Sequence, residues 1–328
     1  MATFKQIRGQ TIKKYTTNPT NPLEGQIWYN STTGTLKGAL NVAAAWASGT
    51  AYPVLIQDVS GAGTTTAAIY YGGYSTPDAH TEKTNEFDGS AWTAAPDLNS
   101  GRVMYQIGTG TQTAALGAGG ASPALSPNPT ALSEEWNGST WTVGNILNTA
   151  RSGGTGGGVQ TSALLVGGSG VTNTESYNGT SWSNETAAPS TAFASRAFSG
   201  QSETSNIFIG VNPNSEDTYS YDGSSWSDLS KTLVSGQNTP AAGSQQGTST
   251  AAVIAGGFSP APAIIGTGQI YDGSAWATTA SLATARRGGG AAGTAASCMG
   301  VGGEEPARSS DNEEYTGAYV GNVTVTTS

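Results

Sequence analysis

Apolar residues along the chain gather in short stretches, and no stretch shows the 3.6-residue spacing of an amphipathic helix. Ala67–Tyr71 is one such stretch, and it ends in the diglycine Gly72-Gly73. It is followed by Phe87 and Trp92, which flank an Asp-Gly-Ser-Ala segment. Aromatic residues on both sides of an Asp-Gly or Asn-Gly turn are typical of a β-hairpin. The pattern therefore predicts an all-β chain.

Both features recur with one period of about 46 residues. The diglycines stand at Gly72-Gly73, Gly119-Gly120, Gly167-Gly168, Gly256-Gly257 and Gly302-Gly303, with Ile209-Gly210-Val211 in the remaining place. The tryptophans stand at Trp46, Trp92, Trp141, Trp182, Trp226 and Trp276. Each period has room for four short strands. Repeats of this length and content are typical of β-propeller blades.

Six such units predict a six-bladed β-propeller with four-stranded antiparallel blades, and a solenoid is the competing geometry. The last unit is incomplete, because no tryptophan follows residues 313–317 at the expected place, while residues 27–37 form a spare hairpin. Pairing between the first 50 residues and the last 20 would close the ring and protect its sheet edges. We predict a short arm over residues 1–23 and a propeller over residues 24–328.

Composition narrows the classes of function. Glycine accounts for 47 of 328 residues, and the crowded inner strands of a propeller explain runs such as Gly153–Gly158. One cysteine and one histidine form no internal disulfide and no His/Cys metal site, so we expect no cofactor and no metal. No apolar run reaches the length of a membrane helix, and the first residues lack a secretory pattern. We therefore expect no membrane insertion and synthesis in the cytoplasm.

Charge divides the chain into a basic start and an acidic remainder. Residues 1–23 hold four of the 13 basic residues and no acid, which gives +4, while the other nine basic and 22 acidic residues give −13. An acidic body does not favour nucleic-acid binding. Basic and apolar residues mix in the arm, which predicts docking on another protein. The predicted docking residues are Phe4, Lys5, Ile7, Arg8, Ile12, Lys13, Lys14 and Tyr15.

Arginines recur at one phase of the repeat, at Arg102, Arg151, Arg196 and Arg286, with Gln237 in another unit. Glu86, Glu135 and Glu175 stand one or two residues before the repeated aromatic. We interpret the arginines and these acids as buried ion pairs between strands rather than as ligand-binding groups. The repeated tryptophans are interpreted in the same way, as core between blades. The non-repeated loops 122–129 and 258–263 are better places for a ligand, whose contact residues the sequence does not identify.

No residue set predicts catalysis. His80 is the single histidine and is expected in a loop, and Cys298 is expected to act as a small buried hydrophobe. The adjacent acids Glu134-Glu135, Glu304-Glu305 and Glu313-Glu314 would point to opposite faces of a strand, which makes them poor acid/base pairs and solvated edges. We therefore expect no catalytic residues and no enzyme activity.

Two resemblances follow from these motifs. The apolar strand ending in Gly-Gly, the aromatic and the spaced tryptophan resemble kelch repeats over roughly residues 40–320. Residues 18–34, Asn-Pro-Thr-Asn-Pro-Leu-Glu-Gly-Gln-Ile-Trp-Tyr-Asn-Ser-Thr-Thr-Gly, resemble the opening of virion-associated kelch-like proteins of marine bacteriophages. This second resemblance implies a structural or host-contacting part of a phage particle.

The resemblance implies a non-enzymatic virion protein of the tail or fibre. Its arm would bind other virion proteins, and its loops would contact a host surface glycan or protein, or a neighbouring subunit, including a homo-oligomer within the particle. Two alternatives stay open. One is a carbohydrate-binding or glycan-hydrolysing propeller, and the other is a cellular kelch-type interaction module.

Overall fold

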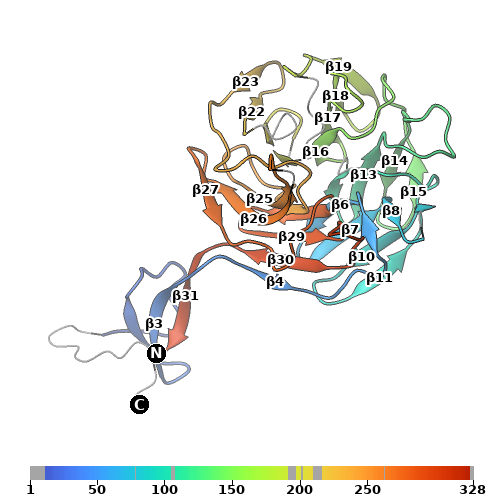
Figure 1. Ribbon diagram of the computed structural model, residues 1–328. Coiled ribbons are helices and arrows are strands. Elements are labelled where there is room, and N and C mark those ends of the chain that lie inside the picture. Colours follow the sequence, from blue (N-terminus) through green and yellow to red (C-terminus); the bar gives the residue numbers. More distant parts are fainter. Residues whose placement is uncertain are drawn as a thin grey trace. The chain divides into compact units, whose positions relative to one another are not determined.

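The computed structural model describes residues 12–77, 79–104, 108–190, 197–200, 202–209, 216–261 and 263–325, and these residues form strands and loops without a helix (Figure 1). Two compact units are present. Unit 1 comprises Met1–Ala44 with Gly317–Ser328, and unit 2 comprises Ala45–Thr316. No helix long and apolar enough to span a membrane occurs in the described residues.

Unit 1 contains one four-stranded sheet in the order β1-β2-β3-β31. Its strands are β1 (Lys13–Tyr15), β2 (Ile27–Asn30), β3 (Thr35–Val42) and β31 (Tyr319–Thr324). The hairpin predicted over residues 27–37 is present as β2 and β3, and β31 from the other end of the chain pairs antiparallel with β3. The structure thus divides the chain at residues 44 and 316, whereas the sequence suggested a division after residue 23. Pairing across almost the whole chain length is the reason.

Unit 2 is built from four-stranded antiparallel sheets, as the repeat predicts. The first has the order β11-β10-β7-β6, and the next three keep chain order from inner to outer strand. Their strands are β6 (Ser60–Thr64), β7 (Ala67–Tyr71), β10 (Thr84–Phe87), β11 (Trp92–Ala95); β12 (Gly108–Thr111), β13 (Ala114–Ala118), β14 (Ser133–Trp136), β15 (Trp141–Val143); β16 (Thr155–Val159), β17 (Ser162–Val166), β18 (Thr174–Tyr177), β19 (Trp182–Glu185); β20 (Ala197–Gly200), β21 (Asn206–Ile209), β22 (Thr218–Tyr221) and β23 (Trp226–Asp228).

The remaining strands of unit 2 form one larger sheet and one small sheet. In the larger sheet, a single pair between Gly243 and Met299 joins two four-stranded parts. Their strands are β24 (Ala242–Gly243), β25 (Ala252–Phe258), β26 (Ile264–Tyr271), β27 (Trp276–Thr279); β28 (Gly290–Thr294), β29 (Ser297–Val301), β30 (Asn312–Thr316) and β4 (Ala45–Ser48). The small sheet holds β5 (Ile56–Gln57), β8 (Tyr74–Ser75) and β9 (Ala79–His80).

Trp46 occupies the tryptophan position that the last repeat lacks. It lies directly opposite Tyr315 in the pairing of β4 with β30, as Trp276 lies opposite Tyr271 in the hairpin of β26 and β27. The Trp46 and Tyr315 rings lie 5.1 Å apart, and the indole Nε1 donates to the carbonyl of Ala280 at 3.0 Å. Two segments from opposite ends of the chain therefore build one sheet.

The aromatic hairpins turn through four residues, and the acidic or amide side chain at the first position closes the turn. In one of them, Asp272 Oδ1 accepts from the amides of Ser274 and Ala275 at 2.8 and 2.9 Å, and Gly273 has φ +89°. A two-residue Asp-Gly turn would have a positive φ at both residues. Only the glycine adopts it, because the side-chain acceptor takes over the backbone bonds of the turn.

Inner strands of neighbouring sheets approach closely. The strand β6 contacts β28 and β12, and β12 contacts β16. A Cβ on Gly61 would stand 2.5 Å from the carbonyl oxygen of Ala291 on β28, so only glycine fits there. Farther out, the apolar core lies between sheets, where Tyr71 packs on Trp141 of the next sheet with ring centroids 4.6 Å apart. Glycine therefore serves packing, as predicted.

Replacing Trp46 tests the joint between the two chain ends. Trp46→Ala is expected to lower the free energy of unfolding by about 2–3 kcal/mol, less than for a fully buried tryptophan because the ring is partly exposed. Urea unfolding measures the change. The exposed Val143 on β15 provides a control, since Val143→Ala should change it by less than about 0.5 kcal/mol. Equal effects of the two substitutions would contradict the assignment.

The hairpin turns should respond to acid. Hydrogen bonds from the Ser274 hydroxyl and from the amides of Ala275 and Ser274 lower the pKa of Asp272 to about 2. Because the folded pKa lies below the unfolded one, its stabilisation is present above pH 4 and is lost as pH falls towards 2. Asp272→Asn keeps the acceptor, as Asn137 and Asn178 do in their turns, without titrating. The melting temperature of the native protein should exceed that of the variant less at pH 2.5 than at pH 5, and a constant difference would refute this.

Candidate functional site

Three of the repeated arginines lie fully buried between neighbouring sheets. Arg151 Nη1 is 2.8 Å from Glu175 Oε1, and equivalent ion pairs join Arg102 to Glu134 and Arg286 to Glu313. Each arginine comes from the loop that follows one sheet, and its carboxylate comes from the third strand of the next. The interpretation of the arginines as buried ion pairs is confirmed at these positions. Arg196 lies outside the described residues.

Each buried arginine also holds the backbone on both sides. Arg286 Nε donates to the carbonyl of Gly302 at 2.9 Å, while its own carbonyl accepts from Gly257 of the preceding sheet at 2.8 Å. The partner Glu313 accepts from the Ala283 amide at 2.7 Å. A Cβ on Gly256 would stand 2.5 Å from the Arg286 carbonyl, and both glycines have positive φ. The repeated diglycine is therefore required by the close approach of the arginine backbone.

Two of the predicted carboxylate partners are corrected. Glu134, rather than Glu135, pairs with Arg102, and Glu86 has no ion pair among the described residues. Neighbouring residues of a strand point to opposite faces, so the carboxylate that reaches the interface is always two residues before the aromatic. Glu134 and Glu313 are consequently buried and not the solvated edges that the sequence suggested.

The same interface position holds uncharged residues elsewhere. Gln237 Oε1 accepts from Gln269 Nε2 at 2.9 Å. In another unit Ile56 takes the backbone place of the arginine, since its carbonyl accepts from the Gly303 amide at 2.8 Å, and Asn85 at the acid position donates through Nδ2 to the Tyr52 hydroxyl at 2.9 Å. Where the arginine is replaced, the acid is replaced with it. This paired change indicates a structural contact between sheets, because a ligand site would not require both partners to change together.

The repeated tryptophans also belong to the interfaces, as predicted. Trp141 Nε1 donates to Thr84 Oγ1 of the preceding sheet at 3.0 Å, and Trp276 Nε1 donates to Thr218 Oγ1 at 2.9 Å. Cys298 is buried, and burial raises the pKa of its thiol, in agreement with its expected role as a small hydrophobe. No cluster of three or more metal-binding side chains occurs in the described part of the chain.

Segments outside the four repeated strands carry partly exposed aromatic and cationic side chains. The Arg308 guanidinium lies 4.1 Å from the centre of the Tyr74 ring, and His80 packs against the same ring at 5.0 Å. His80 lies in the short strand β9 rather than in a loop, and burial lowers its pKa. Arg287 lies 5.3 Å above Phe258, at the edge of the predicted loop 258–263, and also pairs with Glu304. Arginine over an aromatic ring provides a flat surface with hydrogen-bond donors.

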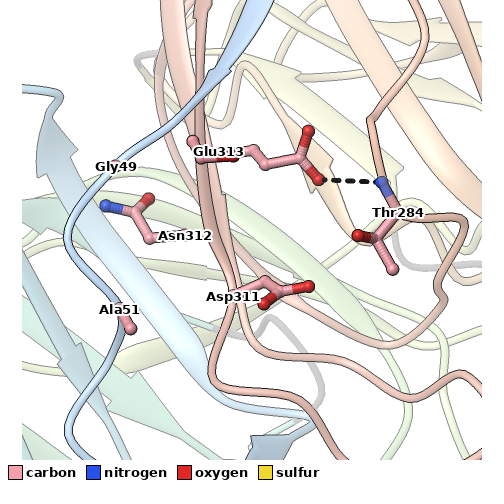
Figure 2. Close-up of a pocket in the computed structure, with 7 residues that line it drawn as sticks. Gly49, Ala51, Thr284, Asp311, Asn312 and Glu313 are labelled. Carbon is pink, nitrogen blue, oxygen red and sulfur yellow. Dashed lines mark hydrogen bonds between the residues drawn. The ribbon is translucent and has the colours of Figure 1, made fainter.

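A small polar pocket lies beside the joint of β4 and β30 (Figure 2). Its volume is about 100 Å³, and it is lined by Ser48, Gly49, Ala51, Thr284, Asp311, Asn312 and Glu313. Figure 2 shows Glu313 directed to Thr284 and Asn312 directed to Gly49. Glu313 is already engaged by Arg286, and typical ligand pockets measure about 300–1,000 Å³. The pocket fits water or a very small solute, not a sugar.

The predicted docking residues fall partly within the description. Phe4, Lys5, Ile7 and Arg8 lie outside the described residues. Lys13 and Lys14 are exposed on β1, Ile12 is exposed just before it, and Tyr15 is half-buried. The described part of the arm is thus the edge strand of a sheet, paired parallel with β2. The three residues of β1 carry no sequence pattern that predicts their pairing with β2.

Sequence reasoning missed two other contributors to the interfaces. Gln112 and Gln160 lie in turns between inner strands, and each reaches back to the preceding sheet. Gln160 Nε2 donates to the carbonyls of Ala115 and Trp136 at 2.9 and 2.7 Å. The shared position of Gln112 and Gln160 in the repeat was the available signal.

Comparison with known proteins supports the fold. No protein-family profile matches the sequence, and no curated protein matches it. Among solved structures, one described as "Structure of YjhT" is similar, with a TM-score of 0.63 and 15% sequence identity over 83% of this chain and 99% of that one. At this identity the likeness shows the fold alone, which is of the β-propeller type.

Removing one partner of a buried ion pair should be costly. Arg151→Ala leaves Glu175 buried without its cation and is expected to lower the free energy of unfolding by about 3–5 kcal/mol. The double variant Arg151→Gln, Glu175→Gln copies the Gln237–Gln269 pair and should recover more than half of the loss. Chemical unfolding of the two variants measures this. A double variant no more stable than Arg151→Ala would contradict the structural role.

Proposed function

We propose that this chain is a non-enzymatic structural protein of a bacteriophage particle, associated with its tail or fibre and made in the host cytoplasm. Unit 1 attaches the chain to another particle protein. The loops of unit 2 contact a host surface or a neighbouring particle protein. The observation that carries the proposal is that the repeated arginines and tryptophans lie in contacts between sheets, so that unit 2 is a scaffold whose non-repeated loops remain for a partner.

We also propose that unit 2 is a propeller of six blades, closed by β4 and β30. Support comes from the inner strands, since β28 contacts both β24 and β6, and β16 contacts β20. The Ser199 hydroxyl of β20 also donates to the carbonyl of Ala251, the residue before β25, at 3.3 Å. The pairing of Trp46 with Tyr315 completes a sheet that the C-terminal repeat begins. A closed ring leaves no inner sheet edge for unwanted pairing.

Support for the particle role comes from the N-terminal segment. Residues 18–34 carry the phage-like motif, and the structure gives them a common task. Asn18 Oδ1 accepts from Trp28 Nε1 and Asn30 Nδ2 at 3.2 and 2.9 Å, so the Asn-Pro start of the motif is tied to its Trp-Tyr-Asn strand. The motif is therefore the framework of unit 1. The basic strand β1 lies at the edge of this sheet.

Glycan binding by the loops is a second candidate, favoured by Arg308 over Tyr74 and by Arg287 over Phe258. Aromatic faces stack on sugar rings, and arginines bind their hydroxyl or carboxylate groups. Incubation with host polysaccharide separates the forms of this function. Retention on the polysaccharide without new reducing ends supports a lectin, whereas new reducing ends support a hydrolase and refute the non-enzymatic proposal.

Charge reversal on β1 tests attachment. The full chain with Lys13→Glu and Lys14→Glu is expected to fold, since both side chains are exposed, but to be at least about tenfold depleted from purified particles. Quantitative mass spectrometry of the particles measures incorporation. Lys231→Glu, an exposed lysine of unit 2, is the control and should incorporate normally. Normal incorporation of the double variant would show that β1 is not the anchor.

A further inference from the structure

Glutamine side chains in the turns between inner strands bind two carbonyls of the preceding sheet. Gln112 Nε2 donates to the carbonyls of Ala68 and Phe87 at 3.2 and 3.0 Å. Ala68 and Phe87 lie directly opposite each other in the pairing of β7 with β10. Gln160 makes the same two bonds to the sheet of β13 and β14. An amide nitrogen with two hydrogens is the donor that such a pair of carbonyls requires.

Glu203 occupies this glutamine position in the next repeat. Gln160 lies three residues before the residue that pairs with the aromatic of its hairpin, and so does Glu203. The residue that follows, Thr161 or Thr204, lies against the glycine of that hairpin in both repeats. The Glu203 amide donates to Ser162 Oγ of the preceding sheet at 3.5 Å. Glu203 therefore also reaches back to the sheet before it, but with a carboxylate in place of an amide.

A carboxylate in this place lacks the donor that the carbonyls need. By the same count, the carbonyls in front of Glu203 belong to Ala163 and Tyr177, which lie opposite each other on β17 and β18. Glu203 Oε2 is buried and has no hydrogen-bond partner among the described residues. A buried carboxylate oxygen that faces carbonyl oxygens is unfavourable unless a positively charged group lies between them.

Asn206 adds a second buried, unpartnered group to the same turn. Its side chain is fully buried, and neither amide atom has a hydrogen-bond partner in the described part of the chain. Its Oδ1 lies over Gly200, where β20 ends and the turn begins. Asn206 shares a strand face with Phe208, which packs on Leu164 of the preceding sheet, so it faces the same interface as Glu203. Other repeats hold alanine at this position, at Ala68, Ala163 and Ala252.

The spacing of these oxygens suits a hard cation. The bonds of Gln112 and Gln160 to their carbonyls measure 2.7–3.2 Å. Oxygen atoms about 3 Å apart form the edges of a calcium coordination shell, whose ligands lie about 2.3–2.6 Å from the ion. We propose that unit 2 binds one Ca²⁺ between the sheets of β17 and β21. Its ligands are the Glu203 carboxylate, Asn206 Oδ1 and the carbonyls of Ala163 and Tyr177, and water fills the remaining positions.

The ion has the same task as the glutamine amides, because it supplies positive charge to two carbonyls of the preceding sheet. Affinity for calcium falls with the number of charged ligands, and a site with one carboxylate belongs in the range of about 0.1–1 mM. Glu203 is only partly buried, so the ion has a path from solvent. Histidine and cysteine take no part, so their scarcity does not bear on this site. The inference does not depend on the particle role.

Thermal unfolding of the full chain, first stripped of metal with a chelator, tests the proposal. At constant ionic strength, about 10 mM CaCl₂ should raise the melting temperature by about 2–5 °C, since only the folded chain binds the ion. Glu203→Gln restores the amide of the other repeats. This variant should melt above the native chain in chelator and show no calcium response. Asn206→Ala restores the alanine of the other repeats and should bind calcium at least about tenfold more weakly.

Controls separate a specific site from general effects of salt. Glu305→Gln removes an exposed acid of the same unit and should keep the full calcium response. Isothermal titration should find one calcium per native chain and none in Glu203→Gln. Magnesium should have a smaller effect, because it dehydrates reluctantly and demands a regular octahedron.

Several results would overturn the calcium site. An unchanged response in Glu203→Gln or Asn206→Ala removes its proposed ligands. An equal response to magnesium indicates screening of the acidic surface instead. A native chain that does not respond to calcium has water between these oxygens, and one stabilised by acid rather than by calcium has a proton there. None of these results changes the proposed particle role, which is tested by incorporation.

Discussion

The placement of each sheet against the next depends on one buried polar contact, which recurs with variation in unit 2. Apolar packing between sheets is strong but non-directional, so it does not fix how one sheet is placed on the next. The arginine in the loop after three of the sheets does so. It bonds to a carboxylate and to carbonyls of the next sheet, while its own carbonyl accepts from the preceding diglycine. Such a pair gains little net energy over an apolar one. Its value lies in specifying one arrangement of short strands.

This constraint orders several other features. The diglycine must stay free of side chains because the arginine backbone lies against it, and the acid must fall two residues before the aromatic because the strand alternates. The Gln237–Gln269 pair keeps the geometry without charge. The repeated arginines, which in the sequence look like a ring of ligand-binding cations, thereby serve contacts inside the fold. What unit 2 offers to a partner lies on loops, where Arg287 and Arg308 rest on aromatic rings.

Local patterns carried most of the prediction. Strands, hairpin turns and tryptophan interfaces follow from residues close together in sequence, and the structure agrees with them. The wrong predictions concern contacts between distant segments and the face to which a strand residue points. Glu135 was chosen over Glu134 because spacing alone does not say which face a strand residue occupies, and a shift of one residue reverses it. Pairing between the two chain ends was predicted, but its distribution over two units was not. β31 pairs with β3 in unit 1 and β30 pairs with β4 in unit 2, and no local pattern separates the two pairings.

The pairing of Ala45 with Thr316 has a mechanical consequence. The chain passes between the two units twice, at residues 44–45 and 316–317, and both passages leave unit 2 from directly opposed positions of β4 and β30. A pull on unit 1 is therefore divided between two strands, β4 and β30, which are paired with each other. A cut in either passage would still leave the units covalently connected through the other.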